Sequence, residues 1–304
     1  MNSLATPNTE SEFSQNGSCK KQARLKGVLW VCICIGSVII YNGLFRELWT
    51  ISLTNEYSTH ILLMPLMSAA LIYRKRSVIQ EDARKGFSWF GILPMSLGLA
   101  MASAVGGMAN MSFRTAGIVI LWMGAFVFVF GLKNFRRLLF PVVSLGFVVP
   151  LPTLPLQALI SLLRRGSAEG VSFLFKVTGT PFYREGIAFV LPGIRIEIAE
   201  QCSSIRSSLA LFISSMLAAH LVLRTNWRKL ILVLAAVPMA MLKNAIRIWV
   251  LSLLAIHVDK KWLTASDLHR DGGILFFILA LLLLFPILWL LKRSEKSHKL
   301  TGIK

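Results

Sequence analysis

The sequence predicts an all-α polytopic membrane protein with about eight transmembrane helices and a short β-hairpin in an outer loop. Three observations support this fold class: 55% of the 304 residues are hydrophobic, only 15% are charged, and the mean hydropathy is +0.65. Soluble domains usually have about 25% charged residues. The formal net charge of +19 does not indicate nucleic-acid binding, because the basic residues stand in short clusters between apolar segments.

Three parts are expected along the chain. Residues 1–27 are polar and predict a disordered cytoplasmic tail, residues 28–291 form the transmembrane domain, and residues 292–304 form a basic cytoplasmic tail. A bilayer requires about 20 apolar residues per span. The expected spans, of which the second and the fifth are short, are Val28–Phe45, His60–Tyr73, Ser88–Gly106, Arg114–Leu132, Leu138–Pro152, Ser203–Val222, Leu230–His257 and Gly273–Leu291.

The positive residues predict the orientation of these spans. Every second connection is basic, with clusters in residues 20–26, 74–85, 133–137, 224–229 and 292–299. Because lysine and arginine accumulate in cytoplasmic loops, both termini are expected to be cytoplasmic. The loops at 46–59, 107–113, 153–202 and 258–272 then face outward.

The longest outer loop has internal structure of its own. The segment GIAFVLPGIRIEI (186–198) contains two β-rich runs around Pro192-Gly193, which predicts a β-hairpin. The segment before it, residues 156–179, is apolar with charged residues interspersed, and we expect it to lie along the outer membrane interface as an amphipathic segment.

Cys202 has a different setting from the other three cysteines. Cys19 lies in the polar tail and Cys32 and Cys34 lie inside an apolar segment, whereas Cys202 stands in AEQCSSIRSSLA just before an apolar helix. The N-terminus of a helix favours a thiolate. Backbone N–H groups from Ser203 and Ser204 onward can stabilise an oxyanion formed by thiolate attack on a carbonyl. The alternative is a buried structural cysteine.

Two further residues are expected on the same side of the membrane. Arg247 lies ten residues inside the outer end of its span, a costly position that marks either a functional residue or a buried pair with Glu197 or Glu200. His269 stands in the last outer loop, where it is either a base for a cysteine nucleophile or simply solvated. The sequence thus brings Cys202, Arg247 and His269 to three successive helices.

These segments resemble the exosortase/archaeosortase family. AEQCSSIRSSLAL is similar to its A-E-x-C-S-G-x-R signature through Cys202 and Arg206, and NAIRI to its N-x-x-R segment through Asn244 and Arg247. HRDGGILFF fits its H-x-x-x-G-x-x-x-F segment, and EYSTHILLMP resembles its early S-H-G-x-L-V-P segment through His60. Ser204 replaces the usual glycine of the signature.

The resemblance implies a cysteine peptidase or transpeptidase in the plasma (inner) membrane of a prokaryote. Its partners would be membrane lipids and exported proteins with a C-terminal sorting signal, which consists of a PEP-type motif, a transmembrane helix and a basic cluster. Cys202 would be the nucleophile, His269 its base or acid, and Arg247 a cation that orients substrate or stabilises the oxyanion. A lipid or glycan amine can be the acceptor; no cofactor, metal or nucleic acid is expected.

Several residues are expected to support this site, and two rival functions remain. Arg270 adjoins His269 and is an alternative third catalytic residue. The supporting set is Glu197, Glu200, Ser203, Ser204, Arg206, Asn244 and Arg270. One rival is a membrane transporter or scaffold associated with exopolysaccharide export, in which Lys243 and Arg247 line a polar pathway. The other is an intramembrane serine protease that uses Ser203 or Ser204.

Overall fold

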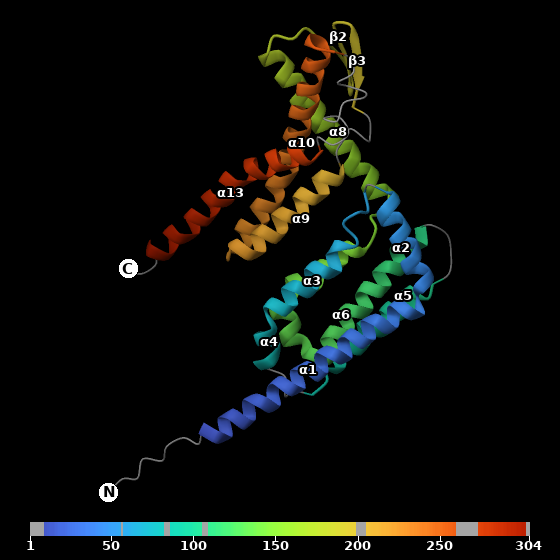
Figure 1. Cartoon of the computed structure of the whole chain (residues 1–304), viewed down its shortest axis with the longest axis vertical. Helices are drawn as coiled ribbons and strands as arrows, with labels where there is room; N and C mark the ends of the chain where they lie inside the picture. Colours follow the sequence, from blue (N-terminus) through green and yellow to red (C-terminus); the bar gives the residue numbers. More distant parts are fainter. Residues whose placement is uncertain are drawn as a thin grey trace. The chain divides into compact units, whose positions relative to one another are not determined.

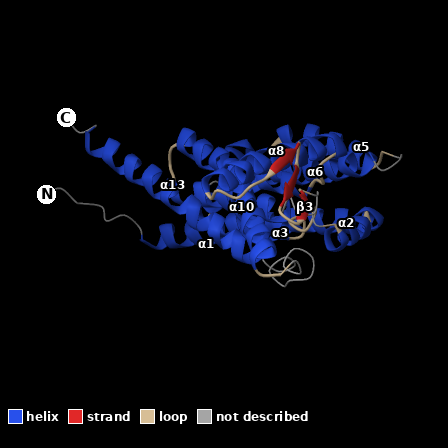
Figure 2. Cartoon of the chain, turned by 90° about the horizontal axis from the view of Figure 1, so that it is seen from above, coloured by secondary structure: helices blue, strands red, loops and turns tan. Residues whose placement is uncertain are grey.

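The computed structural model of the chain describes residues 9–55, 57–81, 86–104, 109–198, 205–259 and 273–301 (Figure 1). The chain divides between Pro152 and Thr153 into two compact units. Most of the described residues are helical, and their strands form one small sheet (Figure 2). The helical fold class with a small sheet, predicted from composition and patterning, is confirmed.

The first unit is built from helices of very different lengths. The longest helix of this unit is its first one, which begins at Thr9. Helix therefore covers much of the polar segment 1–27, for which disorder was expected. The described elements are α1 (Thr9–Ile40), α2 (Asn42–Thr54), α3 (Leu63–Arg74), α4 (Arg76–Glu81), η1 (Trp89–Gly91), α5 (Ile92–Ala102), α6 (Ala109–Arg137), α7 (Leu139–Val143) and η2 (Ser144–Val148).

Glycines bring η1 and α5 into backbone contact with α6. A Cβ atom on Gly98 would lie 2.5 Å from the Leu121 backbone nitrogen, and one on Gly117 would lie 2.6 Å from that of Ala102. Gly91 and Gly124 have equally close backbone neighbours. Small residues allow such close approach of membrane helices, so this pair is held by backbone-to-backbone packing.

The second unit contains the segments that carry the predicted catalytic residues. Its helices are α8 (Thr153–Val177), α9 (Ile205–Val222), α10 (Asn226–His257) and α13 (Gly273–Thr301), and its strands are β1 (Tyr183–Glu185), β2 (Ala188–Leu191) and β3 (Ile194–Glu197). α10 contacts α8, α9 and α13, and α9 also contacts α13. These helices therefore form one bundle.

The predicted hairpin is confirmed, and the sheet contains one strand more than expected. β2 and β3 pair antiparallel with Leu191 opposite Ile194, and Pro192-Gly193 forms the turn. Gly193 has φ of 74°, a conformation that glycine adopts without strain. β1 adds to the other edge of β2. Phe189 and Ile198 of this region pack with Phe175 of α8 and Ile248 of α10 in a buried cluster, which seats the sheet on both helices.

The predicted number of eight spans is not confirmed. Among the described residues, five helical stretches are long and apolar enough to cross a membrane: Lys20–Ile40, Met111–Arg137, Ile205–Val222, Asn226–His257 and Ile274–Glu295. Leu63–Arg74 and Trp89–Ala102 are apolar but shorter. At 1.5 Å per residue, helices of 12 to 14 residues reach only about 20 Å, less than the hydrocarbon core of roughly 30 Å.

The expected span Leu138–Pro152 does not form one long helix, and the expected amphipathic segment 156–179 lies largely within the helix α8. The helical residues of the first are the short helix α7 and the 3-10 helix η2, and a break of a few residues separates η2 from α8. α8 packs closely on α10: a Cβ atom on Gly170 would lie 2.7 Å from Ala245 Cβ. If α7–η2 and α8 together count as one broken span, the total among the described residues is six.

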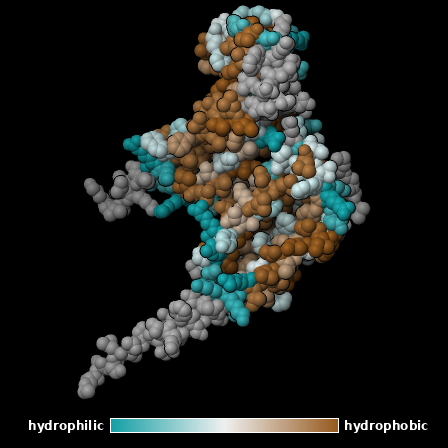
Figure 3. All heavy atoms as spheres, viewed as in Figure 1, coloured by the Kyte–Doolittle hydropathy of each residue, from teal (hydrophilic) through white to brown (hydrophobic). Residues whose placement is uncertain are grey.

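Large hydrophobic side chains cover much of the visible helical surface (Figure 3). Leu93 of α5 is 77% exposed, and Leu282 of α13 is 63% exposed. Water would make such a surface unfavourable, whereas lipid tails match it. The chain is a multi-pass membrane protein.

Candidate active site

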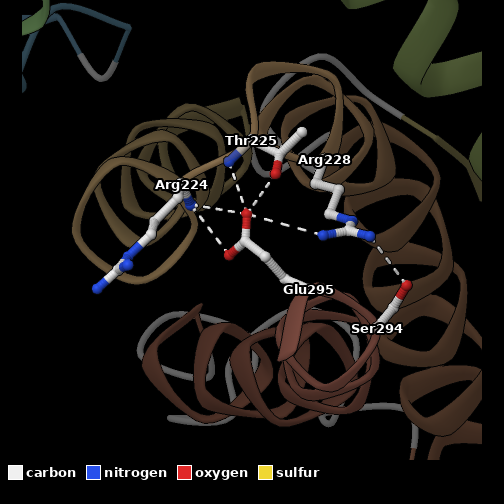
Figure 4. Close-up of polar contacts among 5 residues, drawn as sticks. All are labelled: Arg224, Thr225, Arg228, Ser294 and Glu295. Atoms are coloured by element: carbon white, nitrogen blue, oxygen red, sulfur yellow. Dashed lines mark hydrogen bonds and ion pairs between the residues drawn. The ribbon is translucent and has the colours of Figure 1, made fainter. Parts of the chain in front are cut away.

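The carboxylate of Glu295 in the second unit connects α13 to the end of α9 and the start of α10. Glu295 of α13 accepts hydrogen bonds from the backbone N–H groups of Arg224 (3.1 Å) and Thr225 (2.6 Å), and also from the Thr225 hydroxyl (Figure 4). Its carboxylate lies 3.8 Å from Arg228, whose guanidinium also donates to Ser294 at 3.2 Å. We call this group of five residues the Glu295 clamp. It joins the end of α9, the start of α10 and the last part of α13.

The clamp defines which ends of these helices lie together. α9 ends near the clamp, so its first residue, Ile205, lies at the far end of the helix. α10 and α13 are antiparallel, because Thr225 at the start of α10 contacts Glu295 near the end of α13. Arg247 follows Thr225 by about 22 residues, and Gly273 precedes Glu295 by the same number, which is about 33 Å of helix. The start of α9, Arg247 and the start of α13 are therefore at similar levels, at the end of the bundle opposite the clamp.

Buried polar contacts connect α10 to its neighbours at this level. Lys243 is 1% exposed and its Nζ donates to the hydroxyl of Ser207, the third residue of α9. Asn244, also 1% exposed, donates to Ser167 of α8 at 3.0 Å. Arg247 lies one helical turn farther along α10 and is half-buried. These contacts fix the rotation of α10 about its own axis one turn before Arg247.

Glu197 does not pair with Arg247, which was one of the expected arrangements. Its carboxylate lies 3.8 Å from the Arg164 guanidinium of α8, and Arg164 Nε also donates to the Ile198 carbonyl at 2.8 Å. The cause is position: Arg164 of α8 lies beside the end of β3, where it contacts both Glu197 and the Ile198 carbonyl. Glu197 therefore does not neutralise the charge of Arg247 through an ion pair.

A second ion pair holds the opposite edge of the sheet. Arg184 of β1 contacts Glu169 of α8 at 2.7 Å. The hydrogen bond that Arg184 donates to this carboxylate raises the pKa of Arg184 above its ordinary value. Both edges of the sheet thus have an ion pair with α8, and in sequence Cys202 follows the last strand by five residues.

The predicted site residues divide into two groups. Arg206 is exposed in the first turn of α9, and Asn244 and Arg247 share α10. The expected positions Glu200, Cys202, Ser203, Ser204, His269 and Arg270 lie outside the described residues. In sequence, Cys202 precedes α9 by three positions and His269 precedes α13 by four.

Sequence reasoning missed the contacts of Arg164, Ser167 and Ser207. Arg164 and Ser167 stand in a segment expected at the membrane interface, and serine is common in membrane helices. The available signal was the spacing of Lys243 and Arg247, since residues four apart share one face of a helix. Among the described residues, no group of three His, Cys, Asp or Glu side chains is close enough to hold a metal ion.

Comparison with known proteins gives one match. The family model described as Transmembrane exosortase (Exosortase_EpsH) matches residues 48–286. No curated protein and no solved structure matches the chain. The matched region begins within α2, ends within α13 and covers most of the helices and strands of both units.

Proposed function

Because the chain belongs to the transmembrane exosortase family, we propose that it cleaves C-terminal sorting signals of exported proteins with Cys202, Arg247 and His269. Family membership supports a membrane sorting transpeptidase role in general. The proposal adds the catalytic residues, the outer location of the site and the nature of the signal: a short PEP-type motif, a transmembrane helix and a basic cluster.

One observation carries this proposal: the start of α9, Arg247 and the start of α13 are at the same end of one bundle. The contact of Lys243 with Ser207 puts the first turn of α9 next to α10 one turn before Arg247. In sequence, Cys202 precedes α9 by three residues and His269 precedes α13 by four. This arrangement supports a joint site, because short connections keep residues near the helix ends that they adjoin.

Arg247 suits the proposed chemistry because it is a permanent cation inside an apolar bundle. The Cys202 thiolate attacks the carbonyl carbon of the scissile peptide bond, and Arg247 stabilises the negative charge that develops on the oxygen. Collapse of this intermediate breaks the C–N bond, and His269 gives its proton to the leaving amine. Water or an amine of a lipid or glycan then attacks the thioester and releases Cys202.

The basic residues near the clamp support an outer location for this site. Arg224, Arg228, Lys229, Lys292 and Arg293 all lie at the clamp end of the bundle. By the positive-inside rule this end is cytoplasmic, so the Arg247 end faces outward. A substrate anchored by its own membrane helix would present its motif at that depth.

The experiment that tests the proposal is co-expression with a reporter protein that ends in such a sorting signal. Cys202→Ala should abolish removal of the reporter's tail, read as a size shift on a blot, while the level of the membrane protein stays normal. Cys32→Ala is the matched control, since this exposed cysteine of α1 is far from α9 in sequence. Unchanged processing by the Cys202 variant would refute the role of this thiol and favour Ser203 or Ser204.

The transporter alternative depended on Lys243 and Arg247 lining a polar pathway. Lys243 is 1% exposed and donates to Ser207, so it is enclosed by side chains. A residue that lines a water-filled pathway would be exposed to it. The structure favours an interhelical contact for Lys243.

A further inference from the structure

Two basic side chains hold the chain on either side of residues 199–204, the segment that contains Cys202. Before the segment, Arg164 of α8 donates from Nε to the Ile198 carbonyl at 2.8 Å. After the segment, Lys243 of α10 donates to the Ser207 hydroxyl in the first turn of α9. Both flanks of the segment are thus bonded to helices that are distant in sequence.

The two helices that supply these contacts are locked to each other. Asn244 of α10 donates to Ser167 of α8 at 3.0 Å. Beside this bond, a Cβ atom on Gly166 would lie 2.2 Å from the sulfur of Met241. Arg164 and Lys243 each lie within one helical turn of this contact, so a shift of one flank relative to the other would have to break it.

The contact of Lys243 of α10 with α9 costs free energy, because the amine of Lys243 is buried. Lys243 is 1% exposed, and among the described residues its hydrogen-bond partner is a hydroxyl, with no carboxylate at ion-pair distance. Burial of an amine without a counter-charge disfavours folding. Methionine would fill similar volume without the cost of burying an amine, which makes Lys243→Met an informative substitution.

We propose that Arg164 and Lys243 are positioning residues: they fix the two ends of the Cys202 segment relative to Arg247. The inference rests on the proposed function, because it names what holds the nucleophile of that site. Arg164 acts through the Ile198 carbonyl and Lys243 acts through Ser207. Neither has to touch the substrate.

The test compares Arg164→Met and Lys243→Met with two matched controls, Arg165→Met on α8 and Lys229→Met on α10. Arg165 adjoins Arg164 but is exposed, and Lys229 is at the clamp end of α10. The full chain is assayed in two ways: by processing of the reporter, and by the rate at which iodoacetamide alkylates Cys202, read by mass spectrometry. The second readout does not require catalysis.

Both positioning variants should lower processing at least tenfold and change the alkylation rate of Cys202 at least threefold, whereas the controls should match the unsubstituted protein. Lys243→Met should also unfold at the same temperature or higher, because it removes a buried amine. A purely structural lysine would give the opposite result, with lower stability and activity that falls only in proportion to the folded protein.

Ser207 provides an independent variant if Lys243→Met does not fold. Ser207→Ala should reproduce the loss of processing, and Ser207→Thr, which keeps a hydroxyl, should restore it. If the contact is the functional unit, the double variant of Lys243→Met and Ser207→Ala should be no worse than Lys243→Met alone.

Two results would overturn the inference. One is wild-type processing and wild-type alkylation in both Arg164→Met and Lys243→Met. The other is loss of processing while the alkylation rate of Cys202 is unchanged, because the two residues would then act elsewhere. If Cys202→Ala itself keeps full processing, the proposed function fails, but the alkylation rates still decide whether these residues position the segment.

Discussion

The α5–α6 pair of the first unit and the α8–α9–α10 group of the second unit are both packed closely, but by different means. In the first, Gly91, Gly98, Gly117 and Gly124 let backbones touch. In the second, glycines of α8 are accompanied by buried polar bonds, from Lys243 to Ser207 and from Asn244 to Ser167. A hydrogen bond has a preferred direction, whereas the contacts at the glycines require only that two backbones lie close together.

The difference indicates what each region needs. Close backbone packing gives dispersion contacts along the whole interface and tolerates small rotations. A buried hydrogen bond fixes one atom relative to another and is costly when it is broken. The α8–α9–α10 group, which adjoins the proposed catalytic residues, is held by buried hydrogen bonds. A catalytic site requires side chains in fixed positions, and such bonds provide them.

The largest effect is expected for a large residue at a glycine contact. Gly98→Leu should destabilise the first unit by about 3 kcal/mol or more, because its Cβ would lie 2.5 Å from the Leu121 backbone nitrogen. Thermal unfolding in detergent measures this. Gly36→Leu in α1 is the control, since no atom lies within 4 Å of a Cβ there. Equal melting temperatures for the two variants would contradict glycine-dependent packing.

The next largest effect is expected at the clamp. Glu295→Ala should lower stability by about 1–3 kcal/mol, because the N–H groups of Arg224 and Thr225 and the Arg228 guanidinium lose their shared acceptor. The same unfolding assay applies. Glu295→Gln keeps an acceptor oxygen and should fall between the two proteins; a Gln variant as unstable as the Ala variant would mean that charge alone matters.

A smaller effect is expected for the bond between α8 and α10. Asn244→Ala should cost about 1 kcal/mol of stability and reduce reporter processing, because it removes the contact with Ser167 one turn before Arg247. A double-mutant cycle with Ser167→Ala measures the coupling between the two side chains. Zero coupling would show that the polar bond does not distinguish this group from the glycine pair.

The smallest effect is expected at the surface of the sheet. Arg195 and Glu185 approach to 2.9 Å, but their side chains are 68% and 46% exposed. Glu185→Gln should change the free energy of unfolding by about 0–1 kcal/mol, since water screens the pair. Chemical denaturation can measure so small a difference. A loss as large as that of Glu295→Ala would show that exposed contacts also hold the second unit.

Local patterns predicted the elements of the second unit well. The Pro192-Gly193 turn and its flanking β-rich runs gave the hairpin, and three long apolar runs gave α9, α10 and α13. The family resemblance, read from short motifs, agrees with the family match. β1 was missed because three residues are too few to show an alternating pattern.

Sequence by itself determined that the chain is a membrane protein of this family, because hydropathy and motif order are properties of local segments. Tertiary structure decided the rest. Within the apolar segment Leu138–Pro152, helix covers only Leu139–Val148, as α7 and η2, since hydropathy does not record where a helix ends. Glu197 pairs with Arg164, and Lys243 reaches Ser207. Charge predicts that a partner is needed, but the register of packed helices and strands decides which one is within reach.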